Sequence, residues 1–89
     1  MDFDPSNVNI RLSASDEDAA SIQRLARLAY AQAPHGPALL AELDGEPVAA
    51  IGFADGRQVG DPSRTTPALF RLLRLRRLET RAIAFVFGA

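Results

Sequence analysis

The chain has 89 residues, 47% of them hydrophobic, and a formal net charge of −1 at neutral pH. This length suits one domain with a single core, and the apolar content argues against a disordered chain. The slight acidity excludes a general attraction to nucleic acid or anionic lipid, and no apolar run approaches the ~20 residues of a membrane-spanning helix. Without cysteine and with one histidine, neither a disulfide framework nor a typical metal site is expected.

The N-terminal sequence MDFDPSN predicts a flexible lead-in over residues 1–7, followed by one domain over residues 8–89. This segment is acidic and lacks the apolar stretch of a secretory signal, so we expect a cytoplasmic protein. All ten basic residues are arginine, which together with abundant alanine is typical of a GC-rich genome.

The first structured elements are a strand and a helix. Apolar residues alternate with polar ones over residues 8–12, which predicts a half-buried strand. A helix is expected over residues 16–31, because Ser15 can accept the amide hydrogen of Asp18 and three acids in the first turn complement the helix dipole. The sequence Pro-His-Gly-Pro at residues 34–37 ends this helix.

The stretch LLAELDGEPVAAIGF, residues 39–53, predicts a β-hairpin at the centre of the fold. Its turn is Asp44-Gly45, a pair that readily adopts positive φ between two apolar runs. Residues 48–51 are apolar on both faces, as expected for a strand covered on both sides. A second turn at residues 55–56 leads into a short strand over residues 57–60, followed by a loop over residues 61–64.

The C-terminal part predicts a helix and a last strand. Thr66 and Pro67 are a cap and first-turn pair that opens a helix over residues 67–81. Residues 82–87 predict a strand that would close a right-handed βαβ unit with two parallel strands. The expected class is therefore α+β, with a mixed, mainly antiparallel sheet in the order β-α-β-β-β-α-β.

This element order and two sequence stretches resemble the N-terminal half of the GNAT acyltransferases. NIRLSASDEDAASIQRLARLA resembles their first strand and helix, and LLAELDGEPVAAIGFADG resembles their second and third strands. The layout is also similar to short actinobacterial GNAT-like proteins. The resemblance covers residues 8–87 and implies a truncated, half-GNAT domain. In active members, a glycine-rich R/Q-x-x-G-x-G/A loop holds the pyrophosphate of the acyl-CoA on its amides.

The corresponding loop of this chain, residues 61–67, departs from that pattern. It has no glycine, Pro67 lacks an amide hydrogen, and Asp61 adds a negative charge. The family's later helix and last two strands, which carry its tyrosine acid, have no counterpart. The resemblance therefore implies no catalytic residue and no cofactor. Acetyl-CoA is a ligand only under the alternative that the chain is a divergent acyltransferase or CoA-binding protein.

Three polar side chains are candidate catalytic groups, and each has an ordinary structural explanation. His35, flanked by proline and glycine, has no acid or nucleophile at a telling spacing and is expected to be a solvated loop residue. Tyr30 is expected at the edge of the core with its hydroxyl in water. Glu42 is expected on the less buried face of a hairpin strand.

The candidate for an anion or CoA fragment is the segment before the second helix. Arg64, Thr65 and Thr66 precede a helix N-terminus, where free amides and the dipole attract anions. The structural alternative is that Thr66 caps the helix while Arg64 pairs with Asp61.

The second helix combines an apolar stripe with a basic face. The stripe consists of Ala68, Leu72, Leu75, Leu78 and Ala82, and the basic face of Arg71, Arg74, Arg77 and Arg81. Three interpretations stay open: a core helix with a solvated arginine face, a basic face for nucleic acid or membrane, and a helix partly buried against another subunit. The overall acidity and the lack of interleaved aromatics argue against nucleic acid, and membrane binding is less expected still.

A homodimer is the partner that the sequence predicts. A terminal strand at the sheet edge, without charge or proline, would leave apolar residues and unpaired backbone exposed, and monomers rarely leave such an edge open. The expected interface residues are Leu69, Phe70, Leu73, Ile83, Phe85, Val86 and Phe87.

The leading hypothesis is thus a non-catalytic, dimeric half-GNAT domain that serves as a binding or scaffolding module. The alternatives are an acyl-CoA-dependent N-acyltransferase or CoA binder, and a small regulatory partner that docks an acidic protein or nucleic acid through its arginine face. No metal site is expected, and the small-molecule ligand is not indicated.

Overall fold

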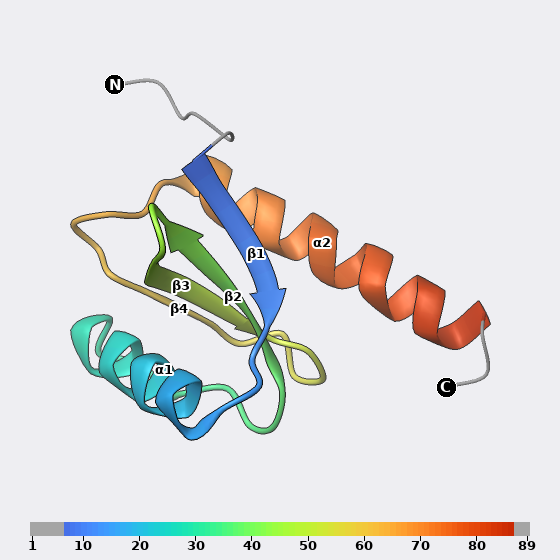
Figure 1. Ribbon diagram of the computed structural model, residues 1–89, viewed down its shortest axis with the longest axis horizontal. Helices are drawn as coiled ribbons and strands as arrows, with labels where there is room; N and C mark the ends of the chain where they lie inside the picture. The colour runs from blue at the N-terminus through green and yellow to red at the C-terminus, as the bar shows by residue number, and fades with distance from the viewer. Residues whose placement is uncertain (1–6, 87–89) are drawn as a thin grey trace.

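The computed structural model describes residues 7–86, with side chains up to residue 83. Four strands, β1 (Val8–Leu12), β2 (Ala38–Leu43), β3 (Glu46–Gly52) and β4 (Gln58–Gly60), form one antiparallel sheet in the order β1-β2-β3-β4. Figure 1 shows this sheet between the helices α1 (Asp16–Leu28) and α2 (Pro67–Val86). The α+β class and the first six predicted elements are confirmed.

The hairpin of β2 and β3 turns at Asp44-Gly45, as the sequence predicts. The φ angles of these residues are 51° and 82°, both in the left-handed region that this tight turn requires. The β2–β3 register shifts between Ala41 and Glu42, because β3 carries one extra residue, Val48. Such a bulge turns Val48 and Ala49 toward the same core.

The two faces of the sheet support two separate apolar cores. Alternation along β2 and β3 sends successive side chains to opposite faces, so the hairpin contributes to both. The core on the α1 side consists of Ile22, Leu25, Ala26, Ala38, Leu40, Ala50 and Val59. The core on the α2 side consists of Leu39, Ala41, Val48, Ala49, Ile51, Leu69 and Leu73. The expectation that β3 is covered on both sides is confirmed.

Helix α1 begins as predicted but ends three residues earlier. The Ser15 hydroxyl accepts the backbone N–H of Asp18 at 3.1 Å, which is the expected cap. At the other end Tyr30 adopts a φ of 52°, and the backbone N–H of Ala31 donates to the carbonyl of Ala26 at 3.0 Å. This 6→1 bond is the helix-ending motif that normally places glycine in the left-handed position. Tyr30 is 99% exposed, so its predicted place at the core edge is wrong.

Substitution of Tyr30 by glycine should therefore stabilise the protein. A non-glycine residue in the left-handed region costs about 1 kcal/mol, and an exposed ring loses little packing when it is removed. We expect Tyr30→Gly to raise the free energy of unfolding by about 0.5–1 kcal/mol in urea titrations. Tyr30→Ala is the matched control, since it removes the ring but keeps the backbone strain. A gain of equal size in both variants would contradict the explanation.

The predicted last strand is wrong for the residues described, because α2 continues as a helix to Val86. No glycine or proline interrupts the sequence between residue 68 and residue 87, and alanines at 82 and 84 favour helix. The guanidinium of Arg81 also donates to the carbonyls of Phe53 and Ala54, at 3.0 and 3.2 Å. The βαβ crossover and its parallel strand pair are consequently absent from residues 7–86.

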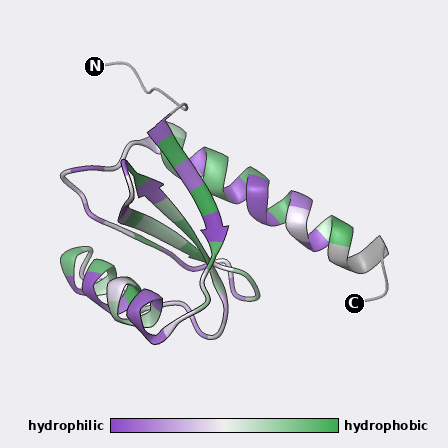
Figure 2. Cartoon of the chain, in the orientation of Figure 1, coloured by the Kyte–Doolittle hydropathy of each residue, from purple (hydrophilic) through white to green (hydrophobic). Residues whose placement is uncertain are grey.

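The side of α2 that faces the sheet also differs from the expected stripe. Leu69 and Leu73 are buried at 1% and 0% exposure, whereas Leu75 is 51% exposed. Each buried leucine follows a residue of the predicted stripe, which corresponds to a rotation of about 100° around the helix. The stripe of Ala68, Leu72, Leu75, Leu78 and Ala82 thus does not form the core, and α2 has a second apolar surface. Figure 2 shows hydrophobic and hydrophilic residues interspersed along the coloured part of α2.

Candidate functional site

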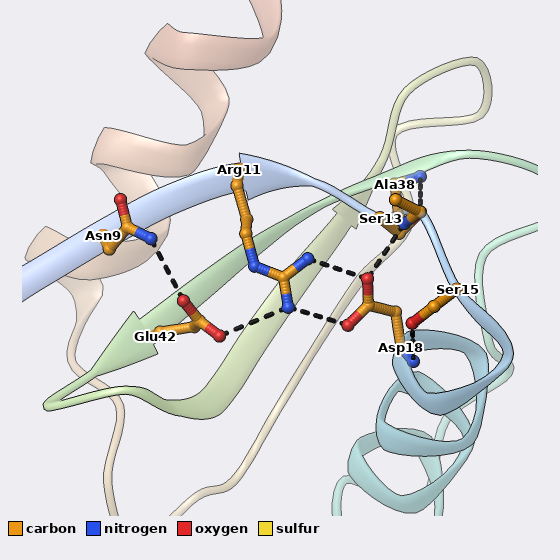
Figure 3. Close-up of polar contacts among 8 residues, drawn as sticks. Asn9, Arg11, Ser13, Ser15, Asp18, Ala38 and Glu42 are labelled. Carbon is orange, nitrogen blue, oxygen red and sulfur yellow. Dashed lines mark hydrogen bonds and ion pairs between the residues drawn. The ribbon is translucent and has the colours of Figure 1, made fainter.

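The densest polar cluster joins β1, β2 and the start of α1 (Figure 3). Arg11 makes two hydrogen bonds of 2.7 Å to the carboxylate of Asp18 and a third, of 3.3 Å, to Glu42. The backbone N–H of Ala14 also donates to Asp18, at 2.9 Å, and Asn9 donates to Glu42 at 3.1 Å. Each carboxylate oxygen of Asp18 and Glu42 accepts a hydrogen bond from the same chain, so the cluster fastens α1 to the sheet.

The electrostatics of this cluster favour its charged form. Hydrogen bonds from Arg11 and from the amide of Ala14 hold the pKa of Asp18 well below its usual range. The hydrogen bond to Asp18 likewise raises the pKa of Arg11. Asp18 is only 5% exposed and its carboxylate is ion-paired, which suits a structural acid rather than a proton donor or acceptor. Glu42, the candidate base, belongs to the same network.

The three residues of the predicted anion site before α2 form hydrogen bonds and an ion pair within the chain. The guanidinium of Arg64 lies 2.6 Å from the carboxylate of Glu46 and forms its ion pair there rather than with Asp61. The hydroxyl of Thr65 donates to the carbonyl of Asp61 at 2.9 Å, and the hydroxyl of Thr66 accepts the N–H of Leu69 at 3.2 Å. The predicted cap is thus confirmed, and the predicted Arg64–Asp61 pair is wrong.

Asp61 itself organises this loop. The hydroxyl and the backbone N–H of Ser63 both donate to its carboxylate, and these bonds lower the pKa of Asp61. The loop therefore presents a carboxylate to solvent close to the helix N-terminus, where an anion would have to bind. This arrangement favours structural capping over anion binding.

The four residues of the basic face lie in two different environments. Arg77 and Arg81 donate to the carbonyls of Phe53 and Ala54, which close the turn between β3 and β4. The guanidinium of Arg81 also lies 5.9 Å from the centre of the Phe53 ring. Arg71 and Arg74 are exposed on the remaining side of α2. Of the four, only these two make no side-chain hydrogen bond or ion pair with other described residues.

The same turn holds the segment that contains His35. The carboxylate of Asp55 accepts the backbone N–H groups of His35 and Arg57, each at 3.0 Å, and these bonds lower the pKa of Asp55. The imidazole of His35 is exposed. His35 therefore contributes its backbone to the structure, in agreement with its expected place in a loop.

Four of the seven predicted dimer-interface residues have described side chains, and three of these four pack in the protomer. Leu69 and Leu73 are core residues of the protomer and have no surface left for a partner, and Phe70 packs against the same core. Ile83 is 60% exposed on the last turns of α2. The side chains of Phe85 and Val86, and the whole of Phe87, lie outside the described residues. Figure 1 shows these last turns projecting beyond the sheet.

A surface that sequence reasoning did not single out is the outer edge of β1. Ser13 donates its backbone N–H to the carbonyl of Ala38, and the carbonyl of Asn7 accepts from Asp44, so odd-numbered residues face β2. Because peptide groups alternate along a strand, the N–H and C=O groups of Val8, Ile10 and Leu12 point outward. β1 is the last strand on its side of the described sheet. The alternation over residues 8–12 predicts this strand, but a strand prediction does not reveal the strand's place in the sheet.

Two depressions on the described part of the chain carry no convergent chemistry. A groove of about 450 Å³ lies at the start of α1, lined by Ser13, Ser15, Asp16, Gln23 and Gly36 among others. A second, of about 360 Å³, lies at the other end of α1 beside His35. Among residues 7–86 no three His, Cys, Asp or Glu side chains gather as they would around a metal ion. Neither described helix is both long and apolar enough to cross a membrane.

Comparison with known protein families, with curated proteins and with solved structures finds no match to this chain. The resemblance to GNAT proteins thus rests on the sequence stretches and on the order of the elements. The observed order is β1-α1-β2-β3-β4-α2, and the strand predicted after α2 is not present up to Val86.

Proposed function

We propose that the chain is a non-catalytic, homodimeric, GNAT-like module that binds or scaffolds other proteins in the cytoplasm. The observation that carries this proposal is the outer edge of β1, where three residues present unpaired backbone groups beside half-buried apolar side chains. An edge of this kind is a template for pairing with another strand.

The edge lacks the devices that usually prevent such pairing. β1 has no proline, and its one charged residue, Arg11, is held by Asp18 and Glu42. Leu12 is 51% exposed, on the face of the sheet that packs against α2. The opposite edge strand, β4, has only three residues and offers much less backbone. The joining strand proposed here is therefore β1, since residues 82–86 are helical.

A two-fold axis at Ile10 gives a consistent antiparallel pairing of two β1 strands. Val8 then lies opposite Leu12 of the second copy, and the apolar side chains of both copies share one face. On the other face Asn9 lies opposite Arg11 of the second copy, so no like charges meet directly. Cross-strand pairs of this type stabilise antiparallel sheets by about 0.2–1 kcal/mol each.

The non-catalytic part of the proposal is supported by the polar groups. The carboxylates with clearly lowered pKa values, Asp18, Asp55 and Asp61, each accept hydrogen bonds that fix a turn, a cap or an ion pair. Arg64, Thr65 and Thr66 are engaged within the chain. Shifted pKa values are also found at structural networks, and here each shift has such a cause.

Multi-angle light scattering on the wild type and on Leu12→Lys tests the dimer. We expect a wild-type dimer, and a folded monomer for Leu12→Lys, because a lysine at a sheet edge opposes strand pairing. Ala20→Lys, which places the same charge on the exposed side of α1, should remain dimeric. Circular dichroism checks the fold of both variants.

Two outcomes would contradict the proposal. A monomeric wild type at all concentrations studied would remove the dimer and leave the β1 edge without a role. Saturable binding of acetyl-CoA in a calorimetric titration would instead favour the acyltransferase or CoA-binding alternative.

A further inference from the structure

The outer face of α2, defined here as Arg71, Arg74, Leu75 and Leu78, is turned away from the sheet. These positions follow the spacing i, i+3, i+4 and i+7 and therefore lie on one side of the helix. Leu75 is 51% and Leu78 60% exposed, while Leu69 and Leu73 bury the opposite side. Leu75 and Leu78 lie three residues apart, so their exposed side chains are neighbours and form a small apolar patch.

The charges of α2 are unbalanced on this face. The helix contains five arginines and one acid, Glu79, whose carboxylate lies 3.7 Å from Arg76. Arg77 and Arg81 are bound to backbone carbonyls of the β3–β4 turn. Arg71 and Arg74 make no hydrogen bond or ion pair with other described residues. The outer face thus offers two leucines with two uncompensated guanidinium groups.

We propose that this face docks an acidic amphipathic helix of another protein. Two leucines three residues apart are anchors for the apolar side of such a helix, and its flanking carboxylates would pair with Arg71 and Arg74. The 20 residues of α2 form a rod about 30 Å long, which is enough for several turns of contact. This binding goes beyond the homodimer and does not depend on it, because β1 supplies the edge.

Charge and the small apolar area argue against three other partners for this face: a second copy of the chain, nucleic acid and a membrane. A second copy of the same face would bring four arginines together without acids to pair them. Nucleic acid binding draws mainly on phosphate neutralisation, which a chain of net charge −1 with an apolar centre on this face serves poorly. Helices that lie on membranes have a wider apolar face than two leucines provide.

Fluorescence anisotropy with defined probes tests the proposal. The first probe is a synthetic helical peptide of about five turns, with leucines along one side and glutamates flanking them. The others are the same peptide with lysine in place of glutamate, a short DNA duplex, and vesicles containing phosphatidylglycerol. We expect saturable binding of the acidic peptide that weakens with salt, and at least about tenfold weaker binding of the lysine peptide.

Two double variants separate charge from apolar contact. Arg71→Glu/Arg74→Glu and Leu75→Ser/Leu78→Ser should each weaken the acidic peptide about tenfold or more. The matched controls on α1, Arg27→Glu and Leu28→Ser, should leave the affinity unchanged. Equal affinity for the glutamate and lysine peptides would overturn the proposal, as would an affinity that Leu75→Ser/Leu78→Ser leaves unchanged. Tighter binding of DNA or vesicles would also overturn it and would assign the face to that ligand. None of these outcomes bears on the oligomeric state, which Leu12→Lys tests separately.

Discussion

Replacing Leu73 by alanine is expected to lower the free energy of unfolding by about 3 kcal/mol. Leu73 is fully buried between α2 and the sheet, in the core that also contains Leu39 and Ile51. Truncation removes apolar contacts and leaves a cavity, and such changes typically cost about 2–5 kcal/mol. Small domains have only about 5–15 kcal/mol in total. Urea titration followed by circular dichroism measures the change.

The control is Leu78→Ala, on the opposite side of the same helix and 60% exposed. We expect its effect on stability to stay within about 0.5 kcal/mol, as for other exposed positions. Comparing the two variants also shows which side of α2 packs against the sheet. If Leu73→Ala kept its stability and lost only self-association, Leu73 would be an interface residue and the packing described here would be wrong.

Removal of the Asp18 carboxylate is the second change with a large expected effect. Asp18→Asn keeps the size of the side chain but ends the ion pair with Arg11, so the variant should unfold at a lower temperature at neutral pH. The pKa of Asp18 is lowered on folding, so its contribution to stability is complete above the unfolded value of about 3.9. It is lost as the pH falls from about 4 toward the folded pKa.

The difference in melting temperature between wild type and Asp18→Asn should therefore shrink in acid. Melting curves between neutral pH and about pH 2 measure this dependence. Asp16→Asn is the control, since Asp16 lies in the same helical turn and is exposed. A constant difference across this range would mean that the carboxylate of Asp18 contributes through shape rather than through charge.

Local signals were enough to predict most of the fold. The Asp44-Gly45 turn, the Ser15 and Thr66 caps and the alternation along β1 each depend on residues a few positions apart. The end of the chain was different. The apolar residues after Arg81 fit a strand, but residues 82–86 continue α2. A short apolar run is compatible with either a strand or a helix, and contacts with distant parts of the chain, which no local pattern encodes, bear on which of the two forms.

The candidate site was less predictable for the same reason. The sequence identified the arginines of α2, but not that Arg77 and Arg81 serve the β3–β4 turn while Arg71 and Arg74 do not. It also identified apolar stripes on α2, but the choice of stripe depends on how the helix packs. A shift of one residue, from Leu72 to Leu73, corresponds to about 100° around the helix and so changes which side of α2 faces the sheet.

The hairpin of β2 and β3 carries apolar residues on both faces. The two helices that cover these faces become available at different times during synthesis. Hairpins with two-residue turns form within microseconds, and α1 precedes the hairpin in the chain, whereas α2 leaves the ribosome after the other described elements. Until α2 docks, one side of a nascent sheet with Leu39, Ala49 and Ile51 is open to water. A chain stalled or cleaved before Pro67 would expose that side permanently, and its fate would be aggregation or capture by a chaperone.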